Sequence, residues 1–366
     1  MKLIQKKLFG EIEPIGLSID KAADKAKVSS ATIRNWIKTG YLTQIGKGII
    51  ELTSFNEFME NVAGKQKLIQ RANKLMKDEH DHNTLSELII KKIDGKKWST
   101  VSKEYEDSLS NSYRNKEGIY YTPNKIVCNM LQCISINDNT TFLDPCCGSG
   151  NFIILAIKKG VKPENAYGFD IDANAVKITK KRIQEETGFD ASENIKHLDF
   201  LENAFELKEK FRYDLILTNP PWGKKINKKE KNRYAKIYGT GASFDTTSLF
   251  YFASFKLLTT NGILGFLVQD ALFNIRTFQD TRNHILKQRL IRLVDNGKPF
   301  KGLLTKAYTF ILENDNSINH KVECLSNGIS HIRNQNSFSK NPKSIINFWS
   351  KKEDGKIIEV VYELPH

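Results

Sequence analysis

The run Asn219-Pro220-Pro221-Trp222 places an amide side chain, two prolines and an indole ring directly after an apolar stretch, residues 213–218. That stretch has the composition of a buried parallel strand. The prolines end the strand, because proline has a fixed φ and no N–H to donate to a sheet. Open α/β sheets bind ligands at such strand ends. The amide, the proline carbonyls and the indole suit a flat base with an exocyclic amine, and the alternative is a plain strand-ending turn.

A glycine-rich turn forms a second group. Residues 141–143 predict a strand, the run Asp144-Pro145-Cys146-Cys147-Gly148-Ser149-Gly150-Asn151-Phe152 follows, and residues 153–157 are helical in pattern. Gly148 and Gly150 let the backbone approach a nucleotide-like ligand closely. Position 153 is Ile and no Gly-Lys-Ser/Thr follows, so neither a dinucleotide fingerprint nor a P-loop is present. The acidic residue before the glycines, Asp144, suits a ligand with a positive charge or an amine.

Two further strands are expected to end in carboxylates. Residues 166–172 predict a strand that places Asp170 to accept both hydroxyls of a ribose, with Ile171 next to it. Residues 194–200 predict another, in which Asp199 can accept from an adenine amino group while Phe200 covers the ring.

Five motifs, in this order along the chain, resemble those of the S-adenosylmethionine-dependent DNA adenine-N6 methyltransferases of the gamma class. They are the turn Tyr121-Thr122-Pro123, the loop that begins at Asp144, the acidic second strand, the Asp199-Phe200 pair and the Asn219 run. The resemblance covers roughly residues 113–312. It implies a doubly wound, Rossmann-like class I methyltransferase sheet of seven strands, in the order 3-2-1-4-5-7-6 with strand 7 antiparallel. It also implies S-adenosylmethionine as the cofactor and double-stranded DNA as the substrate.

The resemblance assigns roles to these residues. Tyr121, Thr122 and Pro123 border the methionine end of the cofactor, Asp144 and Gly148 its amino acid, Asp170 the ribose, and Asp199 and Phe200 the adenine. Gly150 and Ile171 complete the cofactor site. The cysteines at 146 and 147 are expected to be small packing residues of the loop. No metal site is expected.

The chemistry of an aromatic amine explains the Asn219 run. The lone pair of the amine nitrogen is delocalised into the ring. If the Asn219 side chain and the Pro220 carbonyl accept the two amino hydrogens, the lone pair becomes available for attack. A duplex buries this amine, so the base has to be flipped out, and Trp222 would stack on it. By the resemblance, Phe300 is the second wall of the base pocket, with Tyr308 as the second choice and simple packing as the alternative.

The formal charge of +14 favours a polyanionic partner such as nucleic acid, against the alternative of a lysine-rich solvated surface. Residues 224–233 form the densest positive run and are read as a loop beside the active site. Lys224, Lys225 and Lys228 are its expected phosphate contacts.

The amino-terminal residues predict a small separate unit. A helix over 17–26, a second over 31–38 and a hairpin over 41–52 resemble the winged helix-turn-helix of excisionase and MerR-type proteins. Its expected DNA contacts are Arg34, Asn35, Lys38 and Lys47. A protein-docking module is the alternative.

The expected organisation is a winged helix-turn-helix over 1–62, a helical connector over 63–112, a catalytic domain over 113–315 and a carboxyl-terminal extension over 316–366, with a strand near 356–362. The gamma class normally carries a large target-recognition domain after its core, and fifty residues are too few for one. The extension, the winged helix or a separate specificity or restriction subunit is therefore expected to supply sequence specificity.

No apolar run reaches membrane-spanning length, and the five cysteines without paired CxxC spacing favour reduced thiols in a cytoplasm. The sequence thus predicts a DNA adenine-N6 methyltransferase of a restriction-modification or related defence system. The alternatives are a relative that methylates RNA or protein glutamine, and a DNA-binding regulator with an inactive core.

Overall fold

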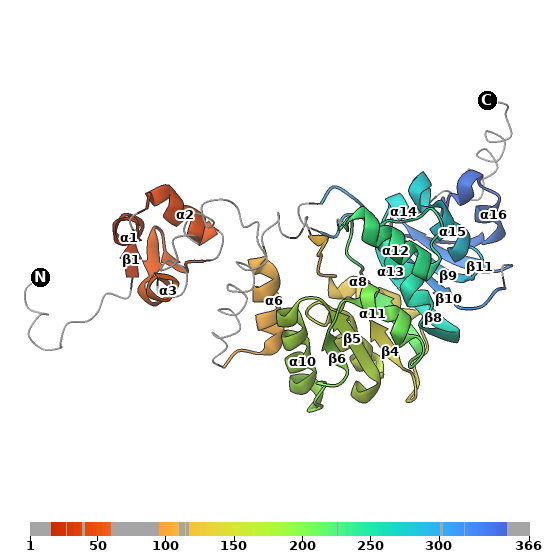
Figure 1. Cartoon of the computed structure of the whole chain (residues 1–366), viewed down its shortest axis with the longest axis horizontal. Helices are drawn as coiled ribbons and strands as arrows, with labels where there is room; N and C mark the ends of the chain where they lie inside the picture. The colour runs from red at the N-terminus through yellow and green to blue at the C-terminus, as the bar shows by residue number, and fades with distance from the viewer. Residues whose placement is uncertain are drawn as a thin grey trace, which may run out of the picture. The chain divides into compact units, whose positions relative to one another are not determined.

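The computed structural model describes residues 16–26, 28–38, 41–59, 95–109, 114, 117–224, 226–300, 303–317 and 319–349 (Figure 1). The chain divides into two compact units, one of residues 1–95 and 103–113 and the other of residues 96–102 and 114–366. Lys225, the expected strand at 356–362 and most of the expected connector over 63–112 lie outside the described residues.

The first unit contains short helices and a small antiparallel sheet of order β1-β3-β2. Its elements are β1 (Gly16–Ser18), α1 (Ile19–Ala26), α2 (Ser30–Lys38), β2 (Gln44–Gly46), β3 (Ile49–Glu51) and α3 (Leu52–Phe58). Trp36 of α2 is fully buried, with its ring 4.6 Å from that of Phe58. Two helices and a hairpin therefore occur close to the expected positions. Their assignment to a winged helix-turn-helix stays a prediction.

The second unit is built on one mixed sheet with the order β12-β11-β9-β10-β8-β7-β4-β5-β6. Its strands are β4 (Phe142–Asp144), β5 (Ala166–Asp170), β6 (Ile195–His197), β7 (Tyr213–Thr218), β8 (Leu258–Gln269), β9 (Arg289–Asp295), β10 (Ala307–Glu313), β11 (Lys321–Ser326) and β12 (Ile329–Asn334). Counted from β4, the strands β6 to β9 follow the order 3-2-1-4-5-7-6, and β10 is antiparallel to both of its neighbours.

The sheet has nine strands, two more than the expected seven. The additional strands come from the stretch that was expected to be a polar extension: β11 pairs in parallel with β9, and β12 pairs antiparallel with β11. Alternate residues of β11, including Val322 and Cys324, are buried. This two-residue alternation is the pattern of a strand with one buried face, and a composition rich in Asn, Ser and Lys masks it.

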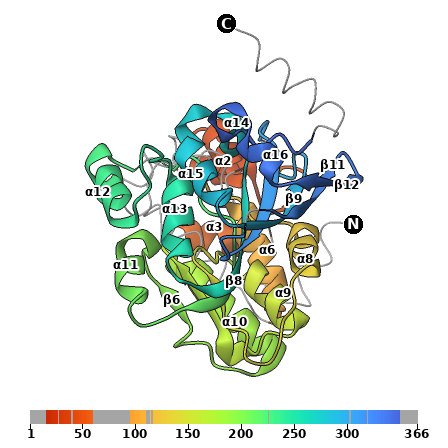
Figure 2. The ribbon, with the colours of Figure 1, turned by 90° about the vertical axis from the view of Figure 1, so that its right-hand side faces the viewer.

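Helices cover both faces of the sheet (Figure 2). One apolar core contains residues of α8 (Asn124–Gln132), α9 (Asn151–Lys159) and α10 (Ala173–Thr187). The other contains residues of α11 (Phe200–Leu207), α12 (Lys228–Tyr238), α13 (Thr246–Phe255) and α15 (Gln279–Ile285). The consecutive residues Phe142 and Leu143 lie in different cores, because side chains alternate along a strand.

The helices α6 (Trp98–Ser108), α14 (Ala271–Asn274) and α16 (Asn336–Ser339) and the 3₁₀ turns at 163–165, 276–278 and 342–344 complete the described elements. Within the described residues, each helix is too short or too polar to cross a membrane. Strands β4, β5, β6, β7 and β8 run parallel, so their carboxyl ends share one edge of the sheet. The candidate site lies at this edge.

Candidate active site

A pocket of about 260 Å³ opens where strands β4 to β7 end. The segment from residue 117 to residue 122 forms part of its wall. The expected site residues that line it are Tyr121, Thr122, Asp144, Gly148, Asp170, Ile171, Asp199, Phe200, Asn219 and Pro221. Pro123, Gly150, Pro220, Trp222 and Phe300 are not among the lining residues. Pro123 directly precedes α8, and Gly150 directly precedes α9.

Asp144 ends β4 and is 1% exposed. Its Oδ1 accepts from the Thr218 hydroxyl at 2.7 Å and from the Cys146 amide at 3.2 Å. Its Oδ2 is buried and has no hydrogen-bond partner among the described residues. Burial raises the pKa of Asp144 to about 7, because the charged carboxylate loses its hydration. Within the described part of the chain, the site thus holds a carboxylate oxygen that lacks a donor.

The other two carboxylates end β5 and follow β6. Asp170 accepts from the Gly148 amide at 2.8 Å and the Asp172 amide at 2.9 Å, and burial raises its pKa to about 6. Asp199 caps α11 by accepting from the amides of Leu201 and Glu202. Phe200 is buried and packs near Phe169 and Phe250. Each carboxylate thus also fixes local backbone, a role that was not predicted from the sequence.

Asn219 is held in one orientation. Its Nδ2 donates to the carbonyl of Tyr120 at 2.6 Å, while its Oδ1 is buried and has no hydrogen-bond partner among the described residues. An amide donates from one end and accepts at the other, so the bond to Tyr120 leaves the acceptor end available. A buried acceptor without a donor costs about 1–3 kcal/mol, and such an unpaired group is expected where a ligand supplies the donor.

The segment that carries Tyr120 also supports the far end of the turn. The Trp222 amide donates to the Gly118 carbonyl at 3.1 Å. Gly118 has a φ of +70°, and a Cβ on it would lie 2.5 Å from the Trp222 carbonyl oxygen. Only glycine fits this close approach. Gly118 and Tyr120 therefore hold the Asn219 turn at both ends, and neither was assigned a role from the sequence.

The Trp222 side chain is more enclosed than a free stacking surface. It is 3% exposed, and its Nε1 donates to the Leu267 carbonyl at 3.3 Å. Its ring lies 5.7 Å from the Tyr120 ring and 5.1 Å from the Phe300 ring, and Phe300 is 8% exposed. Any stacking of these rings on a base requires the three-ring cluster to open. Tyr308, the second choice for Phe300, packs against Phe273 and Phe348 in the other core.

The two cysteines of the glycine-rich turn, Cys146 and Cys147, are packing residues. Cys146 lies with its Sγ 2.9 Å from the Thr218 hydroxyl, and burial raises its thiol pKa well above the ordinary value. Cys147 is buried against Gly168. All five cysteines of the chain are free thiols. Among the described residues, no three His, Cys, Asp or Glu side chains are arranged to hold a metal ion.

Acidic side chains dominate the pocket wall: Glu117, Asp144, Asp170, Asp172, Asp199 and Glu230. Lys224 is the single Lys or Arg among the described lining residues, and its Nζ lies 3.1 Å from Glu117. Its charge lowers the pKa of Asp170, against the larger effect of burial. Lys224, which was expected to contact phosphates, thus lines the pocket as part of an ion pair.

The lysine-rich run was expected to be a loop, and this was wrong from Lys228 onward. Asn227 accepts from the Glu230 amide at 2.9 Å and begins α12, in which Tyr234, Ala235 and Tyr238 are buried. The Asn227-x-x-Glu230 spacing is a helix-start signal that the density of lysines obscured. Lys228 is exposed in the first turn.

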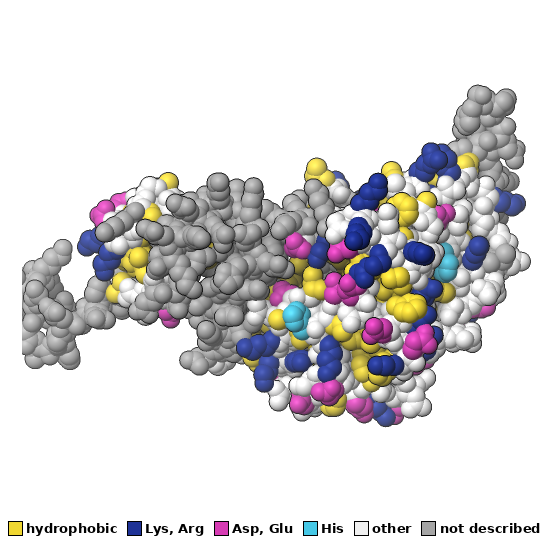
Figure 3. Space-filling model, in the orientation of Figure 1, with side chains coloured by type: hydrophobic (Ala, Val, Ile, Leu, Met, Phe, Trp, Pro, Cys, Tyr) yellow, Lys and Arg dark blue, Asp and Glu magenta, His cyan; other side chains and the backbone are white. Residues whose placement is uncertain are grey.

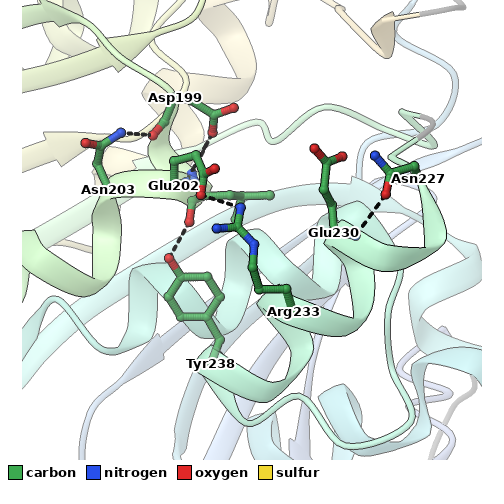
Figure 4. Close-up of polar contacts among 8 residues, drawn as sticks. Asp199, Glu202, Asn203, Asn227, Glu230, Arg233 and Tyr238 are labelled. Carbon is green, nitrogen blue, oxygen red and sulfur yellow. Dashed lines mark hydrogen bonds and ion pairs between the residues drawn. The ribbon is translucent and has the colours of Figure 1, made fainter.

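Helix α12 lies against α11 (Figure 4). Arg233 pairs with Glu202, and the Tyr238 hydroxyl donates to the Leu201 carbonyl. Glu230 and Tyr234 of α12 line the pocket, as Asp199 does. Neither residue was assigned to the site from the sequence.

The remaining expected DNA contacts lie in the first unit. Arg34 and Lys38 are exposed on α2, Asn35 is half-buried there, and Lys47 is exposed in the two-residue turn between β2 and β3. On the face drawn in Figure 3, Lys and Arg side chains of the second unit are scattered among acidic ones and do not gather into one patch.

Similar proteins identify the family. The model of the Eco57I restriction-modification methylase family matches residues 164–301. The type II methyltransferase M.VspI of Vibrio sp. (strain 343) is 44% identical over 366 residues, which cover 99% of this chain and 89% of that protein. The modification methylase CviBIII of Paramecium bursaria Chlorella virus NC1A is 23% identical over 193 residues, 52% of this chain and 47% of that protein.

Solved structures show the same fold. A DrdV–DNA complex is similar with a TM-score of 0.52 and 16% identity, covering 84% of this chain and 36% of that one. The methyltransferase subunit of a type I restriction-modification system from Streptococcus thermophilus has a TM-score of 0.50 and 15% identity, covering 85% and 70%. With the relationship to M.VspI extending over nearly the whole sequence, the chain belongs to the restriction-modification methylases and is a methyltransferase of that family.

Proposed function

We propose that this chain transfers the methyl group of S-adenosylmethionine to the N6 amine of adenine in double-stranded DNA. The observation that carries the proposal is the buried, unpaired Oδ1 of Asn219, which Tyr120 holds in the accepting orientation within the described residues. An exocyclic amine brings two hydrogens. Asn219 Oδ1 accepts one of them and the Pro220 carbonyl the other, which leaves the nitrogen lone pair free to attack.

The pocket residues fit S-adenosylmethionine. The cofactor carries an ammonium and a sulfonium, and the described lining residues include six carboxyl groups against one lysine. The unpaired Oδ2 of Asp144 is a suitable acceptor for the ammonium. Asp170 holds the ribose hydroxyls, and Asp199 and Phe200 hold the adenine. When bound, the cofactor supplies a methyl group activated by its sulfonium.

The target adenine has to leave the duplex to reach Asn219, because base pairing hides its amine. The rings of Trp222 and Phe300 then receive the base, once their mutual contact opens. The first unit is the proposed DNA-binding module, with Arg34, Asn35, Lys38 and Lys47 on its second helix and hairpin tip, and a specificity or restriction subunit is a proposed partner.

The experiment is product identification. The purified chain is incubated with S-adenosylmethionine labelled in its methyl group and with duplex DNA of mixed sequence, and the DNA is digested to nucleosides. The proposal predicts label in N6-methyl-2′-deoxyadenosine. Parallel reactions with RNA and without nucleic acid serve as controls. Label in cytosine, in RNA or in protein contradicts the proposal.

A further inference from the structure

Helix α10 supports the glycine-rich loop from behind. The Thr179 hydroxyl donates to the Gly148 carbonyl at 2.8 Å, and Arg182 Nη1 donates to the Ser149 carbonyl at 2.5 Å. Gly148 and Ser149 line the pocket, whereas the two α10 side chains are not among its lining residues. Arg182 is only 9% exposed, so a charged side chain is buried behind the loop. Burial of a guanidinium is costly unless its hydrogen bonds are made. Arg182 makes one of them to the loop, and its Nη1 also donates to the Ser102 hydroxyl at 3.3 Å.

Arg182 also fixes Asn151, which begins α9. Its Nη1 donates to Asn151 Oδ1 at 2.8 Å, and Asn151 Nδ2 donates to the Thr122 carbonyl at 3.2 Å. Because the guanidinium can only donate, it selects the amide orientation in which the NH₂ group faces Thr122. Thr122 belongs to the segment 117–122 of the pocket wall, and Tyr121 of that segment lies against Gly148. The series Arg182, Asn151, Thr122 thus joins two parts of the wall that are separate in the sequence.

We infer that Arg182 is a positioning residue for the cofactor: acting through Asn151, it sets the spacing between the glycine-rich loop and the Tyr121–Thr122 turn. This inference rests on the proposed cofactor. The bonds of Arg182 to Ser149 and Asn151 hold the parts of the wall assigned to the cofactor, whereas the Asn219 turn is held by Tyr120 and Gly118. Substitution of Arg182 therefore lowers the affinity for the cofactor more than the rate of the bound complex.

The test is a double-mutant cycle on cofactor affinity. Arg182→Met and Asn151→Ala are prepared singly and together, and the Kd for S-adenosylhomocysteine is measured by titration calorimetry. Each single variant is expected to weaken cofactor binding about tenfold or more. Arg182→Met removes the charge-assisted bonds and leaves the Asn151 amide without a fixed orientation, and Asn151→Ala removes that amide. The double variant is expected to be little weaker than the worse single one, since the two side chains act as one unit. Lys181→Ala, exposed on the same helix, is the matched control with unchanged Kd.

Three further readouts separate a positioning role from an effect on stability. Arg182→Lys keeps the charge with a single donor group and is expected to recover part of the affinity. In methylation assays, KM for S-adenosylmethionine is expected to rise while kcat at saturation stays within about threefold, and the urea midpoint identifies variants that are merely less folded. If Arg182→Met does not fold, Arg182→Lys replaces it in the cycle.

The outcomes are distinguishable. A folded Arg182→Met with unchanged Kd, or effects that multiply in the double variant, overturns the positioning role. Wild-type protein that binds neither S-adenosylmethionine nor S-adenosylhomocysteine overturns the proposed function itself.

Discussion

The side-chain amide of Asn219 donates to the backbone carbonyl of Tyr120 at 2.6 Å, across 99 residues of sequence. This bond decides which end of the amide faces the pocket. The same short segment accepts from the Trp222 amide through Gly118. The turn that carries the proposed chemistry is therefore aligned by a backbone segment of another part of the chain.

Gly118→Ala tests that alignment. The new Cβ would lie 2.5 Å from the Trp222 carbonyl oxygen and 2.6 Å from its nitrogen, at a φ of +70°. We expect methyl transfer to be abolished and the free energy of unfolding to fall by more than the roughly 1–2 kcal/mol of positive φ alone. Gly188→Ala is the matched control: its φ is +77°, and nothing lies within 4 Å of the new Cβ. Equal effects of the two substitutions in urea unfolding and in the assay would refute the alignment.

The raised pKa of Asp144, about 7, predicts how cofactor affinity depends on pH. In the proposed role of Asp144, the ionised carboxylate would accept the cofactor ammonium and the neutral acid would do so poorly, so the Kd for S-adenosylmethionine should fall as pH rises through about 7. Asp170, with a pKa of about 6, titrates at a lower pH than Asp144. Asp144→Asn should bind more weakly with a flatter profile. An unchanged profile in the variant would exclude Asp144 as the titrating group.

The cofactor-free protein should show the opposite trend in stability. The folded-state pKa of Asp144 lies above its unfolded value, about 3.9, so the folded state binds more protons between these two values. This group's contribution to the free energy of unfolding is therefore present below about pH 4 and disappears as pH rises through about 7. Urea unfolding of wild type and Asp144→Asn across this range measures it. A wild-type curve that does not decline relative to the variant would count against the raised pKa.

The contact of Trp222 with Phe300 predicts that these rings stabilise the fold, in addition to the role proposed for them. Phe300→Ala should lower the free energy of unfolding by about 3 kcal/mol, because it removes a ring that packs near Tyr120 and Trp222. Phe211→Ala, at a residue 45% exposed, is the control and should change it by less than about 1 kcal/mol. Denaturant unfolding measures both. A Phe300→Ala protein as stable as wild type would mean that the ring contributes no packing.

The proposed DNA binding by the first unit can be tested through the salt dependence of duplex affinity. Arg34→Ala combined with Lys47→Ala should weaken duplex binding, and the slope of log K against log salt should fall by roughly 0.9 for each phosphate that the variant no longer neutralises. Lys25→Ala, exposed on α1, is the control. Fluorescence anisotropy at several salt concentrations gives the slope. A slope equal to that of wild type would favour the alternative of a protein-docking module.

Short motifs were informative because they place particular groups at strand ends. Asp144, Asp170 and Asn219 follow apolar runs, and parallel strands bring such ends to one edge, where they line one pocket. Contacts between residues far apart in the sequence carry no such signal. The carbonyls of Gly118 and Tyr120 align the Asn219 turn whatever their side chains are, and the Arg182 bond to Asn151 spans 31 residues. Strand β11 was missed because its outward residues are polar and disguise the buried alternation. Strand β12 has no such alternation: Ile329 and Ile332 are exposed, and Arg333 is its one buried residue.

The most direct test of the account is single-turnover methyl transfer by Asn219→Ala on duplex DNA, with the Kd for S-adenosylhomocysteine measured on the same preparation. Removing the fixed acceptor should slow transfer to adenine by about 10²–10³, as for other preorganised hydrogen-bond groups, and should leave the Kd within about twofold of wild type. A variant that methylates adenine at the wild-type rate, or one that is inactive only because it no longer binds the cofactor, would contradict the account.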